Sequence, residues 1–229
     1  MVADPDLAAT ADEGAQGHGP EWFAETTGVS RETLGKLTVF VALLNEWQER
    51  KNLVSAASLG DVWRRHIFDS AQLFPLLDED DEIVDLGSGA GFPGLILAIM
   101  GMQNVRLVES NHGKCAFLRA AAEATDTPVE IWTERLETLG KGALAGVADV
   151  VTARAVGPLT RLLPWIAPVI RPGGCALLLK GARTDEELAE ARVGWRMRAT
   201  RLPSRSDPTG TILRLEDIRR VDTKPRRHR

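Results

Sequence analysis

The sequence is poor in cysteine, has no long apolar run and carries no excess of positive charge. Only Cys115 and Cys175 occur among 229 residues, and both lie in apolar runs, so we expect buried reduced thiols rather than a disulfide framework. No stretch reaches the roughly 18 apolar residues that a membrane helix needs. The N-terminus is acidic and lacks the basic and apolar pattern of a signal peptide. We therefore expect a cytoplasmic protein that is not embedded in a membrane.

The charge balance limits the kind of partner. With 28 basic and 32 acidic residues, the formal net charge is −4. Proteins that bind nucleic acid through one broad basic face are usually basic overall, so any contact with RNA must be local. No group of histidines and cysteines has the spacing of metal ligands, and we expect no metal site.

The two ends of the chain differ from its middle in composition and in the periodicity of their apolar residues. Residues 1–19 are rich in Ala, Gly and Asp without an apolar period, and we expect a disordered tail. Residues 20–78 carry helical patterns, with one helix over 34–47, capped by Ser30, and a second over 58–77. These helices predict an N-terminal helical cap. Residues 222–229 form a basic tail.

Strands and helices alternate through residues 79–221. This alternation predicts a mostly parallel seven-stranded sheet with helices on both faces. Such an arrangement is an α/β Rossmann-like fold. The last two strands are expected to close one edge as a hairpin. The expected strands are 82–86, 105–109, 129–132, 148–152, 175–180, 196–202 and 211–215, and the expected helices are 95–100, 113–124, 158–170 and 184–193.

A glycine-rich loop follows the first strand. A dinucleotide fingerprint needs glycines at its first, third and sixth positions, and here these are Gly87, Gly89 and Phe92. The sixth position fails, which favours S-adenosyl-L-methionine over a nicotinamide cofactor. Asp85 suits the cofactor's amino-acid part, and Glu109, ending the next strand, can accept hydrogen bonds from ribose hydroxyls. The alternative is an ordinary strand-to-helix turn with a chance acid downstream.

The chemistry of the methyl acceptor leaves a signature in the sequence. Methylation of a pyrimidine carbon needs a nucleophilic cysteine, and neither Cys115 nor Cys175 is placed for that role. Residues 152–158 lack the Asn/Asp-Pro-Pro-aromatic motif common in enzymes that methylate exocyclic amines. Guanine N7 has its own in-plane lone pair and needs neither a cysteine nor a base. The sequence is compatible with that acceptor.

Two basic residues end neighbouring strands. Arg154 and Lys180 follow the fourth and fifth strands, at the edge of a parallel sheet where ligands bind. We expect both to take part in catalysis, with Lys180 contacting RNA phosphate or guanine. For Arg154 the alternative is an ion pair with Glu137 or Asp149. His66, on an apolar helix face, is either a packed histidine or a functional one.

Several motifs, in order, resemble the RsmG (GidB) family. They cover about 45–220, and the Gly-Phe-Pro-Gly loop ending and the Arg-His-x-x-Asp-Ser element are specific to this family. The motifs are Asn52-Leu53-Val54-Ser55, Arg65-His66-Ile67-Phe68-Asp69-Ser70, Asp85 to Gly94, Val108-Glu109-Ser110, Phe117-Leu118-Arg119, Ala153-Arg154-Ala155-Val156 and Leu179-Lys180-Gly181.

The resemblance implies a class I S-adenosylmethionine-dependent methyltransferase acting on N7 of one guanine in 16S ribosomal RNA. It implies cofactor contacts at Gly87, Phe92, Leu136, Glu137 and Arg154. The alternatives are a small-molecule methyltransferase and a ribosome-assembly factor that holds the cofactor without turnover.

The substrate side departs from the family pattern at one place. The usual adjacent basic pair is replaced by Asn111-His112-Gly113-Lys114, in which only Lys114 is basic. We expect Lys114, His66 and Arg65 to contact the RNA substrate of the small ribosomal subunit, and we expect a monomer. Arg50-Lys51 and Arg64-Arg65 are either solvated helix faces or part of a local basic surface.

Overall fold

The computed structural model describes residues 17–221 and has at its centre one seven-stranded sheet. The expected tails therefore fall largely outside the described residues, which exclude 1–16 and 222–229. The strand order is β3-β2-β1-β4-β5-β7-β6, with β7 antiparallel to both of its neighbours and the other pairs parallel. The strands are β1 (Ile83–Leu86), β2 (Val105–Val108), β3 (Glu130–Trp132), β4 (Ala148–Arg154), β5 (Ile170–Lys180), β6 (Trp195–Pro203) and β7 (Thr211–Arg220).

This topology confirms the predicted Rossmann-like sheet and its closing hairpin. The chain order reverses between β1 and β4, which are direct neighbours although β2 and β3 lie between them in sequence. In such open sheets ligands bind outside the carboxyl ends of the strands at the point of reversal. The loops after β1, β2, β4 and β5 are therefore the place to look for a site.

Each face of the sheet has its own hydrophobic core. Neighbouring residues of a strand alternate between the two cores, as Ile83 and Val84 do in β1 and Val150 and Val151 do in β4. One face is covered by α7 (Leu159–Ile166), α8 (Thr184–Ala191) and the 3-10 turn η3 (Leu136–Lys141). The other is covered by α5 (Gly94–Ile99), α6 (His112–Ala124) and the helices that precede β1.

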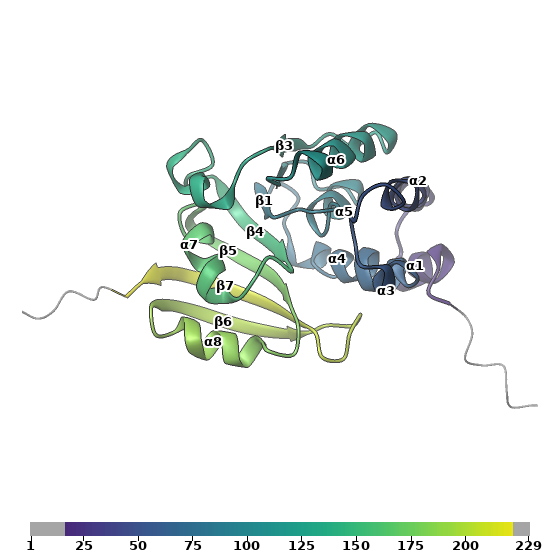
Figure 1. Ribbon diagram of the computed structural model, residues 1–229. Coiled ribbons are helices and arrows are strands. Elements are labelled where there is room, and N and C mark those ends of the chain that lie inside the picture. The colour runs from purple at the N-terminus through teal and green to yellow at the C-terminus, as the bar shows by residue number, and fades with distance from the viewer. Residues whose placement is uncertain (1–16, 222–229) are drawn as a thin grey trace, which may run out of the picture.

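The helices before β1 pack onto the sheet without a core of their own. Phe23, Phe40 and Leu44 from these helices share one cluster with α5, α6 and strand residues of the sheet. Figure 1 shows α1 to α4 gathered at one side of the molecule, with α7 and α8 at the other. These elements are α1 (Pro20–Thr27), α2 (Arg31–Gln48), α3 (Ala56–Leu59), the π-helical turn η1 (Trp63–Phe68), α4 (Asp69–Ala71) and the 3-10 turn η2 (Phe74–Leu76).

Two expected helices differ from the structure. The continuous helix predicted over 58–77 is wrong, because α3, η1, α4 and η2 replace it. The π-helical turn η1 carries the buried side chains of Trp63, His66, Ile67 and Phe68. The helix over 158–170 stops at Ile166. Ile170 instead pairs with Ala148, so β5 begins five residues before its predicted start.

The first long helix agrees closely with its prediction. α2 begins after Ser30, whose Oγ accepts a hydrogen bond from the Thr33 amide at 3.0 Å.

Over residues 17–221, no helix is long and apolar enough to cross a membrane. Cys115 and Cys175 are both buried free thiols, as expected.

Candidate active site

Two glycines in the loop between β1 and α5 differ in the space around the position that a Cβ atom would occupy. Gly87 and Gly89 both have positive φ angles, +69° and +58°. A Cβ on Gly87 would lie 2.7 Å from Val156 Cγ2, whereas a Cβ on Gly89 would meet only the Gly87 carbonyl oxygen, at 3.7 Å. Gly87 therefore allows the loop to pack on the segment after β4, and Gly89 leaves room for a ligand to approach the backbone.

Glu109, at the end of β2, fixes the shape of this loop. One carboxylate oxygen accepts a hydrogen bond from the Gly89 amide at 3.0 Å, and the other accepts from the Asn111 amide at 2.7 Å. Each carboxylate oxygen has further lone-pair capacity, so Glu109 can accept additional hydrogen bonds from a ligand.

Asp85 lies in β1 beneath the same loop and is completely buried. Its Oδ1 accepts a hydrogen bond from Thr152 Oγ1 at 2.8 Å, while Oδ2 has no partner among the described residues. Burial raises the pKa of Asp85 to about 6. A buried carboxylate oxygen without a partner is costly, and its presence at a ligand-binding edge is typical of functional sites.

Arg154, the last residue of β4, is held by the helices that precede β1. Its Nη1 donates to the carbonyl oxygen of Arg65 at 3.0 Å and lies 3.5 Å from Asp69 Oδ2. Its guanidinium carbon lies 4.6 Å from the centre of the Phe92 ring, a cation–π distance. Burial lowers the pKa of Arg154, which nevertheless stays charged. Arg154 thus joins the segment before β1 to the glycine loop.

The expected alternative for Arg154, an ion pair with Glu137 or Asp149, is wrong. The carboxylate beside it belongs to Asp69, whereas Asp149 pairs with Arg171 and also accepts a hydrogen bond from the Glu82 amide. The pairing with Asp69 could not be read from sequence distance, because the residues come from different halves of the fold.

His66 is packed under Arg154 and against Phe92. The imidazole and the Phe92 ring are stacked, with centroids 4.7 Å apart. Burial, and then the charges of Arg154 and Arg65, lower the pKa of His66 to about 3, so the ring is neutral near pH 7. Arg154 Nη2 lies 2.7 Å from Nδ1, which therefore acts as acceptor, and the buried Nε2 has no partner in residues 17–221.

A cavity of about 870 Å³ opens beside Arg154. Its walls come from four places: the segment before β1, the ends of β4 and β5, and the connection between β6 and β7. Arg65, His66, Arg154 and Lys180, all singled out from the sequence, line it together. This volume suits a ligand larger than a single base or amino acid.

Lys180 is engaged within the protein. Its Nζ lies 2.6 Å from Glu187 Oε2 and donates to the Gly157 carbonyl oxygen at 2.9 Å. The same Glu187 oxygen accepts from the Leu159 amide at 3.0 Å. Lys180 therefore holds the loop after β4 in place, and its charge is balanced by Glu187.

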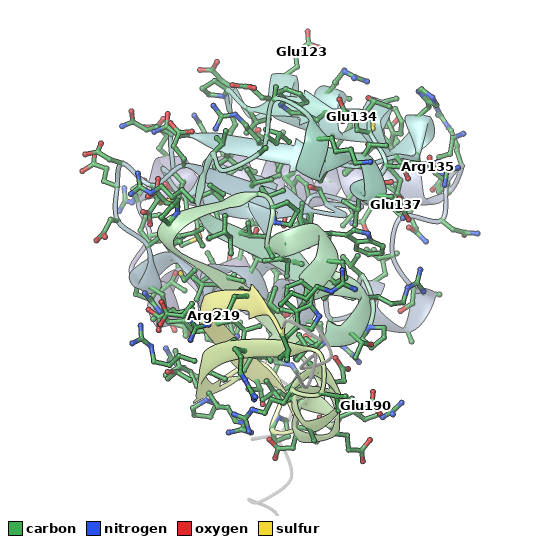
Figure 2. The ribbon with its side chains drawn as sticks, turned by 90° about the vertical axis from the view of Figure 1, so that its left-hand side faces the viewer. Glu123, Glu134, Arg135, Glu137, Glu190 and Arg219 are labelled. Atoms are coloured by element: carbon green, nitrogen blue, oxygen red, sulfur yellow. The ribbon has the colours of Figure 1, made fainter. Side chains whose placement is uncertain are left out.

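Several sequence candidates do not line the cavity: Asp85, Gly87, Gly89, Phe92 and Glu109, in or beside the glycine loop, and Lys114, Leu136 and Glu137. Lys114 is in the first turn of α6, where its amide donates to the Asn111 side chain at 3.0 Å. Leu136 and Glu137 begin η3, with Leu136 packed on the core beneath α7 and Glu137 exposed. Figure 2 shows Glu137 on the same part of the surface as Glu134 and Arg135.

Sequence reasoning assigned no role to several residues of the cavity wall, among them Asp69, Ser206 and Glu187, the partner of Lys180. Asp69 belongs to the Arg-His-x-x-Asp-Ser element, so a signal existed, but no partner could be named for it. Ser206, in the connection between β6 and β7, bonds to Asp69 and carried no signal. Among residues 17–221, no group of three His, Cys, Asp or Glu side chains could hold a metal ion.

Comparison with known proteins finds relatives that match most of this chain. The 208-residue match to the ribosomal RNA small subunit methyltransferase G of Paramagnetospirillum magneticum is 49% identical and covers 90% of this chain and 100% of that protein. The protein of the same name from Rhodospirillum rubrum is 50% identical over 203 residues, with 88% and 99% covered.

Solved structures at low identity share the fold. The TehB-like SAM-dependent methyltransferase from Corynebacterium glutamicum has a TM-score of 0.52 at 16% identity, covering 76% of this chain and 97% of that one. M. jannaschii TYW2 in complex with AdoMet has a TM-score of 0.51 at 15% identity, with 68% of this chain and 76% of that one covered.

The family model described as GidB, rRNA small subunit methyltransferase G, matches residues 33–206, and the chain belongs to this family.

Proposed function

We propose that this protein transfers a methyl group from S-adenosyl-L-methionine to N7 of a guanine in 16S ribosomal RNA of the small subunit. The observation that carries the proposal is the position of Arg154, which lines the large cavity and whose guanidinium carbon lies 4.6 Å from the centre of the Phe92 ring in the glycine loop. Arg154 therefore connects a substrate-sized cavity to the glycine loop, whose own residues do not line that cavity. The family relatives named for rRNA methylation support the same reading.

The residues around the glycine loop fit the cofactor. Asp85 offers an unpartnered carboxylate oxygen for the cofactor's ammonium group, and Glu109 offers lone pairs for ribose hydroxyls. The open side of Gly89 admits close backbone contact. When bound, the cofactor supplies a methyl group on a positively charged sulfur. In this proposal Leu136 and Glu137 lie at the adenine, and Arg154 and the Phe92 backbone border the cofactor.

Two nitrogen bases of the cavity lining are already engaged within the protein. His66 is neutral with Nδ1 bound to Arg154, and Lys180 is paired with Glu187, so neither side chain is a free base. The lining contains no cysteine. Guanine N7 presents a lone pair and carries no proton, so positioning and electrostatics are the main tasks of the protein.

The cavity rim offers local positive charge to an RNA. Arg64, Arg65 and Arg183 lie there, although Arg64 pairs with Asp61 and Arg183 with Glu186. In this proposal the exposed Arg65 contacts phosphate, and Lys114 extends the contact on the far side of the glycine loop. In this proposal the protein acts as a monomer in the cytoplasm.

The test offers several acceptors to the purified protein. Radiolabelled S-adenosylmethionine is incubated with naked 16S RNA, isolated small subunits or bulk tRNA, each from a strain lacking the gene. Label confined to 16S RNA, and lost on cleavage specific for N7-methylguanine, supports both the acceptor and the atom. Label on tRNA would contradict 16S RNA as the acceptor. Label on no RNA, while the cofactor still binds, would favour the alternative of a small-molecule methyltransferase.

A further inference from the structure

The two carboxylate oxygens of Asp69 face different parts of the fold. Oδ1 accepts a hydrogen bond from Ser206 Oγ at 2.6 Å, and Oδ2 lies 3.5 Å from Arg154 Nη1. Asp69 begins α4, Ser206 lies between β6 and β7, and Arg154 ends β4. One side chain therefore connects α4 to the end of β4 and to the connection between β6 and β7, all of which border the 870 Å³ cavity.

Further hydrogen bonds join the connection between β6 and β7 to the segment that precedes β1. Gln72 accepts from the Arg205 amide at 2.6 Å and donates to Ser204 Oγ at 3.3 Å. Arg64 Nη1 donates to the Ser206 carbonyl oxygen at 3.0 Å. Figure 1 shows this connection reaching toward α3 and α4. These bonds fix Ser206, and Ser206 in turn fixes the orientation of Asp69.

Arg154 has only one carboxylate within ion-pair distance among the described residues, and that is Asp69. The Asp69 and Arg154 side chains are 17% and 16% exposed, so the pair is poorly screened by water. The remaining contacts of the guanidinium, with His66, the Arg65 carbonyl and the Phe92 ring, are to uncharged groups. The position of the Arg154 charge therefore depends most directly on Asp69.

We propose that Asp69 is a positioning residue that holds the Arg154 guanidinium between the cavity and the glycine loop, with Ser206 setting its orientation. The proposal rests on the proposed function, because it assigns Arg154 to the site where cofactor and RNA meet. Asp69 itself needs no contact with either. Its effect on the reaction is transmitted through Arg154.

The test is a double-mutant cycle of Asp69→Asn with Arg154→Gln. Asparagine keeps an acceptor for Ser206 and removes the charge that faces Arg154. In the wild-type background we expect Asp69→Asn to weaken S-adenosylmethionine binding and lower kcat/KM for 16S RNA by about tenfold or more. In the Arg154→Gln background the same change should alter both quantities by less than about twofold. Calorimetry without RNA measures the cofactor affinity.

The matched control is Asp149→Asn, which alters another largely buried aspartate side chain that pairs with an arginine. Asp149 accepts from the Glu82 amide and pairs with Arg171 at the opposite end of β4, away from the cavity. We expect this variant to lower the unfolding temperature and to leave cofactor affinity within about twofold of the wild type. The comparison separates positioning from general destabilisation, even where Arg154→Gln binds too weakly to complete the cycle.

Two results would overturn the proposal. One is an equal loss of affinity and kcat/KM from Asp69→Asn in both backgrounds. The other is an equal loss of affinity from Asp69→Asn and Asp149→Asn at matched unfolding temperatures. If the wild-type protein methylates no 16S RNA, the proposed function fails instead, and the cofactor affinities still decide whether Asp69 acts through Arg154.

Discussion

Arg154 Nη2 lies 2.7 Å from Nδ1 of His66, and this contact joins the end of β4 to the π-helical turn η1. The guanidinium can only donate, so Nδ1 must present a lone pair and the imidazole must be neutral. Burial acts in the same direction, because it lowers the pKa of His66 to about 3. The Arg154 environment thus depends on a histidine that stays unprotonated.

The low pKa of His66 predicts a loss of stability in acid. His66 has a lower pKa in the folded state than the ordinary histidine value of 6.5, so the unfolded chain binds its proton first as pH falls. Between about pH 6.5 and pH 3 this residue should cost about 1.4 kcal/mol of unfolding free energy per pH unit. The measurement compares urea unfolding of the wild type and His66→Gln across that range. The stability difference should change in favour of the variant as pH falls, and a pH-independent difference would contradict a neutral buried His66.

Asp85 predicts a pH dependence in cofactor binding. Its pKa near 6 makes the carboxylate partly protonated in mild acid. If its unpartnered oxygen receives the cofactor's ammonium group, S-adenosylmethionine affinity rises with pH through about 6 and then levels off. Asp85→Asn should lose this pH dependence and about tenfold in affinity at neutral pH. Calorimetry across this range measures both.

Thr152 provides a second variant for the same site. Its hydroxyl donates to Asp85, and such a bond favours the charged carboxylate, so Thr152→Val should raise the pKa of Asp85 further. The midpoint of the affinity profile should then shift to higher pH. An unshifted midpoint would show that a group other than Asp85 controls cofactor affinity.

Gly87 and Gly89 form a matched pair with different expected effects. Alanine at either position suffers a similar backbone cost, about 1 kcal/mol, because both φ angles are positive. At Gly87 the new Cβ would also meet Val156 at 2.7 Å, adding about 1–3 kcal/mol of overpacking. Gly87→Ala should therefore lower the unfolding temperature more, and Gly89→Ala should lower cofactor affinity more relative to its destabilisation. Thermal unfolding and calorimetry on both variants check this order, and equal effects would refute it.

The sheet was predictable because its strands leave a local signal. Short apolar runs such as those around Asp85 and Glu109, separated by helical periods, predict the parallel strands that the structure shows, but not the order of those strands in the sheet. The π-helical turn was not predictable in this way. Its apolar residues also fit an α-helix, and the widened turn places His66 against Phe92 and Arg154, which lie far away in sequence.

The site was predictable as a set of residue types at strand ends, but not as a set of pairs. Sequence position placed Arg154 and Lys180 at one edge of the sheet, and the structure places both beside the cavity. Their partners, Asp69 and Glu187, come from an element before β1 and from α8. Such long-range pairing depends on how helices pack on the sheet, and one sequence contains no direct signal for it.

We expect substitutions of Arg65 and Lys180 to differ in their effect on the salt dependence of RNA binding. Arg65 is exposed at the cavity, so a phosphate contact by its side chain would release counterions on binding. Arg65→Ala should reduce the salt slope of 16S RNA affinity, measured between about 50 and 300 mM KCl, by roughly one. Lys180→Met should leave the slope unchanged, because Glu187 already balances this charge.

The stability of the Lys180 variants provides the control for that comparison. Lys180→Met leaves the Glu187 carboxylate, 17% exposed, without its cation and should cost about 3 kcal/mol of unfolding free energy. Adding Glu187→Gln should recover part of this loss, since the unpaired charge is then removed. A salt slope that falls in Lys180→Met as much as in Arg65→Ala would show that Lys180 leaves Glu187 to bind phosphate when RNA is present.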